Sequence, residues 1–169
     1  MIEPTCNDWP HYRTAVLHFG TAPPWTVPAS EFAHPTHSPR RRALGLDRPF
    51  AIVTAFNPHP QRPHASANVL AHAELARCLD SLGLDHLACA GTDPAEVHRE
   101  EGFAVFAAIE TVLDLARRFG QAAVYWWDGA SMWIEPTNAE STRERLDPDT
   151  QCRERGGSPP RLDPDGSSP

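Results

Sequence analysis

The alternation of apolar and polar positions divides the middle of the chain into strands and helices. Short apolar runs rich in β-branched and aromatic residues predict strands, while apolar residues spaced three or four apart predict helices. Between residues 50 and 136 the predicted order is strand, helix, strand, strand, helix, strand and strand. The corresponding segments are 50–56, 66–82, 86–90, 103–108, 110–119 and a hairpin within 122–136. An additional, earlier strand is predicted at residues 12–19.

Local signals set the boundaries of these elements. The run FAIVTAF at residues 50–56 is almost wholly apolar, which predicts a strand buried on both faces. Ser66 is the predicted N-cap of the first long helix, and Gly83 is the predicted stop. Asp128-Gly129 predicts the tight turn of a hairpin in which Trp126 or Trp127 faces Trp133.

The order of the elements predicts an α+β fold. Strand, helix, strand, strand, helix, strand is the βαββαβ core of a ferredoxin-like, split βαβ sheet, to which we add the N-terminal strand and the C-terminal hairpin. We predict one domain over residues 12–136, with a Pro/His-rich loop at 21–49. Residues 1–11 are a predicted tail, and residues 137–169 have the composition of a disordered segment, in which RLDPD occurs twice.

In this topology several polar residues would converge at one edge of the sheet. The end of the strand at 50–56, the start of the following helix, the loop at 91–101 and the turn before the fourth core strand all lie at that edge. The polar residues that these segments carry are Asn57, Ser66, Asn68, Asp93, Glu100, Glu101 and Gln121. Each asparagine taken alone also has an ordinary role, because asparagine caps turns and helices through local hydrogen bonds.

Composition and charge narrow the function classes. The chain has 169 residues and a net charge of -7, which disfavours nucleic acid unless a basic patch such as Arg40–Arg42 overrides it. The four cysteines have no CxxC spacing, which argues against a zinc or redox motif. Cys78 and Cys89 stand in apolar contexts, which predicts buried free thiols in a reducing compartment. Because we find neither a secretory signal nor a membrane span, we predict a cytoplasmic protein with no bound cofactor and no resident metal.

Several motifs from Thr54 onward form a recognisable set: TAFNP at 54–58, Asn68, GTDP at 91–94, EEGFAVF at 100–106 and LARRFGQAAVYW at 115–126. Together they resemble a bacterial family, the domain-of-unknown-function family 3293. The resemblance extends over about residues 12–134 and implies that Asn57, Asn68, the acidic pair and Gln121 matter. Pro60 and Phe56 depart from it, since the family has serine and tryptophan at those places. The resemblance implies no activity.

Three kinds of function fit the predicted edge. A small-ligand or protein-binding module could use the edge residues together with Arg62 and His64 to bind an anionic or amide-bearing ligand. Glu100 and Glu101 would instead suit a ligand with a cationic or amine group. A metal-assisted hydrolase could use Asp93, Glu100 and Glu101 with His59, His64 or His98, although no recognised ligand spacing is present. An adaptor could pair with a protein, or with itself as a homodimer, through the sheet or the aromatic hairpin.

Overall fold

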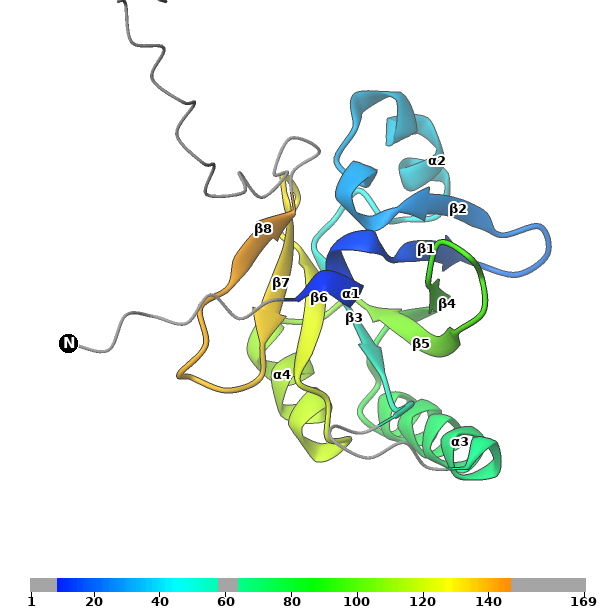
Figure 1. Ribbon diagram of the computed structural model, residues 1–169, viewed down its shortest axis with the longest axis vertical. Helices are drawn as coiled ribbons and strands as arrows, with labels where there is room; N and C mark the ends of the chain where they lie inside the picture. Colours follow the sequence, from blue (N-terminus) through cyan, green and yellow to red (C-terminus); the bar gives the residue numbers. More distant parts are fainter. Residues whose placement is uncertain (1–8, 58–63, 147–169) are drawn as a thin grey trace, which may run out of the picture.

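The computed structural model describes residues 9–57 and 64–146. They form an α+β domain with a single antiparallel sheet, which curls strongly into about half a barrel (Figure 1). The strands are β1 (Val16–Phe19), β2 (Trp25–Pro28), β3 (Phe50–Thr54), β4 (His86–Thr92), β5 (Arg99–Val105), β6 (Ala123–Trp127), β7 (Met132–Pro136) and β8 (Glu144–Leu146). The helices are α1 (Pro10–Thr14), α2 (Ser38–Ala43), α3 (Ala65–Ser81) and α4 (Ile109–Arg118), with short 3-10 turns η1 (Ala29–Glu31) and η2 (Pro35–His37).

The predicted α+β class is confirmed, and the sheet is larger than predicted. Its order is β2-β1-β4-β5-β3-β6-β7-β8, so eight strands share one sheet. Within it, β5 lies between β3 and β4 and is antiparallel to both, while β6 pairs with the other side of β3. The end of β3 and the start of β5 therefore lie at the same end of the sheet.

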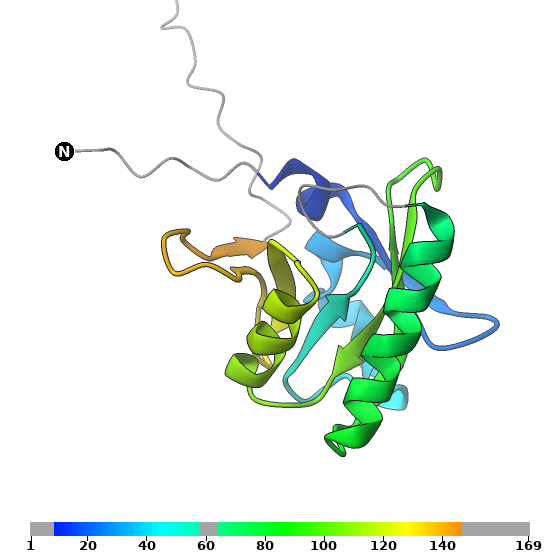
Figure 2. The same ribbon diagram turned by 90° about the horizontal axis from the view of Figure 1, so that it is seen from below.

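The two faces of the sheet bury different cores. Alternate residues of β3 point to opposite faces. Phe50 and Ile52 belong to a core rich in aromatic residues, which we call the aromatic core, while Ala51 and Val53 belong to a second core with α3 and α4. Figures 1 and 2 show α3 and α4 together on one side of the sheet. This division confirms the prediction that this strand is buried on both faces, as an apolar run requires.

The Pro/His-rich segment at 21–49 is more ordered than a loop. It contains β2, both 3-10 turns and α2, and its residues Trp25, Val27, Phe32 and Leu46 belong to the aromatic core. The prediction of a loop is wrong here. The apolar residues of this segment are separated by many prolines and are too widely spaced to show the periodicity of a helix or a strand. Residues 12–14 are likewise helical rather than part of a first strand, since Pro10 starts α1.

The sheet continues beyond Pro136, where the sequence predicted the domain to end. β8 pairs with β7, Leu146 is buried in the aromatic core, and Glu144 forms an ion pair with Arg13 of α1 at 2.8 Å. Disorder is therefore a wrong prediction for residues 144–146. The RLDPD repeat lies almost wholly outside the described residues, as do residues 1–8.

The aromatic hairpin forms as predicted, with a longer connection. Trp126 lies opposite Trp133, and Trp127 is only 2% exposed. The Asp128 carboxylate accepts hydrogen bonds from the backbone N–H groups of Ala130 and Ser131 and from the Trp133 indole. These bonds, with neighbouring Arg143, keep the pKa of Asp128 low although partial burial acts in the opposite direction. Because β8 covers the outer edge of β7, this hairpin is not an open edge of the sheet.

Candidate functional site

A reciprocal pair of asparagines closes the end of β3. Asn57 has a φ of 46°, a left-handed conformation that asparagine tolerates better than most residues. The Asn68 side chain on α3 holds this turn: its Oδ1 accepts from the Asn57 backbone N–H, and its Nδ2 donates to Asn57 Oδ1, both at 3.0 Å. The two asparagines that stand eleven residues apart in the sequence thus contact each other directly.

Glu100 joins this pair from β5. Asn57 Nδ2 donates to Glu100 Oε1 at 2.6 Å, a short distance typical of a bond to a charged acceptor. Thr54 fixes the relative position of the two strands, because its hydroxyl donates to the Glu101 carbonyl at 2.7 Å and accepts from the Phe56 N–H. The described residues provide no hydrogen bond or ion pair to the second carboxylate oxygen of Glu100.

The negative charge of Glu100 acts on two phenols, the partly buried Tyr12 and the buried Tyr125. The Tyr12 hydroxyl donates to the Ala123 carbonyl at 3.1 Å, and the Tyr125 hydroxyl donates to the Tyr12 carbonyl at 2.7 Å. Burial, and secondarily the negative charge of Glu100, raise the pKa of Tyr12 to about 12. Burial raises the pKa of Tyr125 well above its usual value, and Tyr12 and Glu100 add to that effect.

Gln121 braces the same end of the sheet. Its buried side chain donates to the carbonyl of Phe56 at 2.9 Å and to that of Phe119 at 3.3 Å, which ties the end of α4 to the residue before Asn57. Four of the predicted edge residues, Asn57, Asn68, Glu100 and Gln121, are therefore brought together. We call these four residues the polar network.

The other three predicted residues stand apart from the polar network. Ser66 is exposed in the first turn of α3 and is not the N-cap, since the helix begins at Ala65 after His64. Asp93 Oδ1 accepts from the His98 backbone N–H at 2.8 Å and so organises the β4–β5 turn. Glu101 forms an ion pair with Arg99 at 2.6 Å. Consecutive residues of a strand point to opposite faces, so Glu101 is directed away from Glu100.

Sequence reasoning missed His72, which lies one helical turn after Asn68 on α3. Its ring stacks on Phe103, with centroids 4.7 Å apart and planes 7° apart, and its buried Nδ1 has no partner among the described residues. Burial lowers the pKa of His72, although Glu101 acts in the opposite direction. Tyr12 and Tyr125 were also missed, because a contact across more than a hundred residues leaves no local signal.

The metal cluster of the hydrolase hypothesis does not assemble among the described residues. No group of three or more histidine, cysteine, aspartate or glutamate side chains there could hold an ion. Asp93 and Glu101 are occupied as described above, and His59 and Arg62 lie outside the described residues. Cys78 and Cys89 are buried free thiols, as predicted.

No described helix has both the length and the apolar composition needed to cross a bilayer.

Comparison with known proteins yields one family and no characterised relative. No curated protein and no solved structure matches the chain. A family described as "Protein of unknown function (DUF3293)" matches residues 53–124, a range that contains the whole polar network but neither Tyr12 nor Tyr125. Residues 53–124 of this chain therefore match the model of that family, whose function is unknown.

Proposed function

We propose that the polar network binds a small ligand that carries an amine or another positively charged N–H donor. The observation that carries this proposal is the state of Glu100. One of its carboxylate oxygens is fixed by Asn57, and the other has no partner among the described residues. A carboxylate held in one orientation with a free oxygen suits a charged donor, which forms the stronger class of hydrogen bond.

The rest of the polar network supports a positioning role. Asn57 and Asn68 bond mainly to each other, and Gln121 bonds to backbone carbonyls. These groups hold the turn and leave Glu100 as the charged recognition group. A site with one charged residue on a rigid scaffold is typical of selective small-molecule binding.

Local charge favours a cation over an anion. Residues 92–101 of the β4–β5 hairpin carry four carboxylates, at positions 93, 96, 100 and 101, against the single guanidinium of Arg99. The start of α3 would attract an anion through its backbone N–H groups. Glu100 is linked to the first turn of that helix through Asn57 and Asn68, and its negative charge opposes such binding.

The fold forms part of the proposal. It is supported by the chain order β3, α3, β4, β5, α4, β6 and by the sheet order β4-β5-β3-β6, which are consistent with a split βαβ unit. We therefore regard these elements as a ferredoxin-like unit, and β1, β2, β7 and β8 as extensions that curl the sheet. Fold analogy gives no activity, because such sheets host many functions.

The proposal is tested with a matched pair of variants, Glu100→Gln and Glu101→Gln. Both remove one negative charge from the same strand, but only Glu100 belongs to the polar network. Glutamine at position 100 keeps an oxygen that accepts from Asn57, so the variant should fold. Thermal shift is measured with methylamine, putrescine, spermidine and amino-acid amides, and separately with Mg²⁺, Mn²⁺ and Zn²⁺.

We expect at least one amine to stabilise the wild type and Glu101→Gln, but not Glu100→Gln. A ligand present at about 100 times its Kd adds roughly 2.7 kcal/mol, which raises the Tm of a domain of this size by several degrees. The proposal fails if no amine shifts the wild type, or if the shift survives in Glu100→Gln. A metal that stabilises the wild type and neither variant would favour the hydrolase instead.

A further inference from the structure

A hollow lies between the β1–β2 turn, α2 and the start of β4. It has a volume of about 740 Å³, within the range of small-molecule sites. Its apolar lining includes Phe19, Trp25, Leu44 and Leu87, all of which belong to the aromatic core or pack against it. A ligand here would therefore contact a rigid apolar surface that is continuous with the folded interior.

Two polar side chains lie among the residues that line the hollow. Arg40 is exposed, and within the described part of the chain its guanidinium has neither an acidic partner nor an aromatic ring beneath it. Thr21 is also exposed, and its hydroxyl has no described hydrogen bond. The lining contains no aspartate or glutamate, although the chain as a whole is acidic.

The three arginines of α2 differ in their surroundings. Arg41 packs its guanidinium over the rings of Trp127 and Phe32, with Cζ 4.9 and 5.5 Å from the two centroids. Arg42 is exposed and does not line the hollow. Arg40 alone of the three lines it, so the hollow combines an apolar surface with one cation that has no acidic partner among the described residues.

We propose that this hollow binds a small carboxylate that carries an apolar ring or a short aliphatic chain. The carboxylate pairs with the Arg40 guanidinium, whose donors match the two oxygens of a carboxylate, and the Thr21 hydroxyl adds a donor. The apolar part lies against Leu44, Leu87 and Trp25. At physiological ionic strength charges are screened over roughly 8 Å, so the local arginine outweighs the distant acids.

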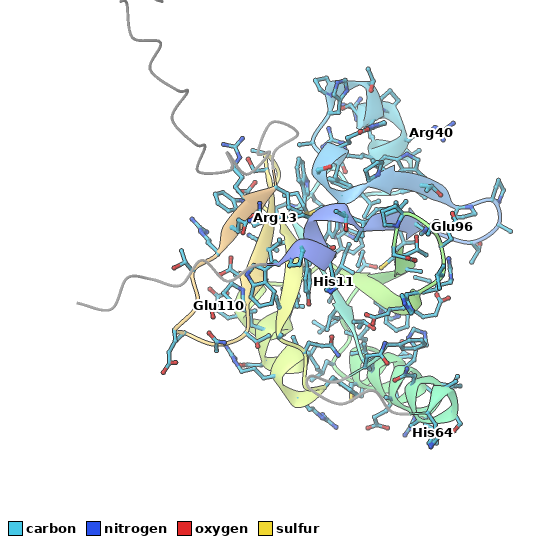
Figure 3. All side chains as sticks on the ribbon, viewed as in Figure 1. His11, Arg13, Arg40, His64, Glu96 and Glu110 are labelled. Atoms are coloured by element: carbon cyan, nitrogen blue, oxygen red, sulfur yellow. The ribbon has the colours of Figure 1, made fainter. Side chains whose placement is uncertain are left out.

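This inference is independent of the polar network. The hollow includes Leu87 and Ala88 at the start of β4, whereas Glu100 of β5 pairs with Gly91 near the end of β4. Figure 3 shows Arg40 and His64, the residue before α3, at opposite ends of the molecule. If the amines do not bind, the proposal of a carboxylate site is unaffected. If the carboxylates do not bind, the proposal of an amine site at Glu100 is unaffected.

The test uses the full chain and isothermal titration with 3-phenylpropionate and octanoate. The neutral amides 3-phenylpropionamide and octanamide serve as matched probes without charge. Arg40→Ala removes the proposed partner, and Arg42→Ala removes the same charge from the same helix without touching the hollow. Ala43→Phe places a ring in the lining and should obstruct the hollow while retaining Arg40.

We expect saturable binding of at least one carboxylate, and binding about tenfold weaker for its amide and for Arg40→Ala. Arg42→Ala and Glu100→Gln should bind it as the wild type does, while Ala43→Phe should bind neither the acid nor the amide. The inference is overturned if no carboxylate saturates the wild type. It is also overturned if Arg40→Ala and Arg42→Ala weaken binding equally, since that would indicate attraction by net charge alone.

Discussion

Replacing Asn68 by alanine removes both hydrogen bonds that this side chain makes to Asn57. Each bond is 3.0 Å long, and a bond of this kind contributes about 1 kcal/mol to stability. The change also leaves the Asn57 backbone N–H and Oδ1 without these partners in a half-buried turn, which adds about 1 kcal/mol. We therefore expect Asn68→Ala to lower the free energy of unfolding by about 2 to 3 kcal/mol, which lowers Tm by about 5 to 10 °C.

A double-mutant cycle separates the two bonds. Asn57→Gly removes the side-chain acceptor and tolerates the left-handed φ, but it keeps the backbone N–H that donates to Asn68 Oδ1. The coupling energy between Asn57→Gly and Asn68→Ala therefore reports only the bond between the side chains, and we expect about 1 kcal/mol. Urea unfolding followed by circular dichroism gives the four free energies.

Asn138→Ala is the control for loss of an asparagine. Asn138 is exposed, and within the described part of the chain its Oδ1 accepts from the Ser141 backbone N–H alone, so its replacement should cost less than about 1 kcal/mol. If Asn68→Ala costs no more than Asn138→Ala and the coupling energy is zero, then the asparagine pair does not hold the end of β3. In that case the orientation of Glu100 would need another explanation.

Two further predictions concern a strand contact and alkaline pH. A Cβ at Gly102 would lie 2.6 Å from a backbone oxygen of β3, whereas a Cβ at Gly91 would have nothing within 4 Å. Gly102→Ala should therefore lower the free energy of unfolding by about 1 to 3 kcal/mol, and Gly91→Ala by much less, as measured by urea unfolding. Equal losses in the two variants would contradict the close contact at Gly102. Burial favours the neutral Tyr12 phenol in the folded state, so the free energy of unfolding should fall by up to about 2.7 kcal/mol between pH 10 and about 12. The chain has only one other tyrosine, Tyr125. In Tyr125→Phe, where phenolate absorbance reports Tyr12 alone, adding Glu100→Gln should lower the observed pKa, and an unchanged pKa would contradict their proximity.

Local sequence signals located most elements because those elements depend on neighbouring residues. The helix predicted at 66–82 is α3, at Ala65–Ser81, and the one predicted at 110–119 is α4, at Ile109–Arg118. The β4–β5 hairpin was misjudged: residues 99–102 look polar, yet they pair with β4 in regular register. A strand whose backbone is fully paired can carry exposed charged side chains, so polarity alone did not identify it.

The residues of the candidate site could be predicted from the sequence only as far as the order of the strands in the sheet could be inferred. Strand order placed Asn57, Asn68, Glu100 and Gln121 at the same end of the sheet. Hydrogen bonds join the first three there, and Gln121 bonds to the carbonyl of Phe56, the residue before Asn57. Sequence could not distinguish Glu100 from Glu101, because their roles depend on which face of β5 each one occupies. It also gave no sign that the charge of Glu100 acts on Tyr12, because the two residues stand far apart in the sequence.

The two proposed sites bind ligands of opposite charge. Their positions predict how the stabilising effects of the two ligands add when both are bound. The two sites share no residue, so each probe should bind alone. If the sites are independent, saturating both should stabilise the protein by the sum of the separate effects. A departure from additivity would mean that one ligand changes the affinity for the other. The structural connection available for such coupling is β4, which contributes Leu87 and Ala88 to the hollow and pairs at Gly91 with Glu100.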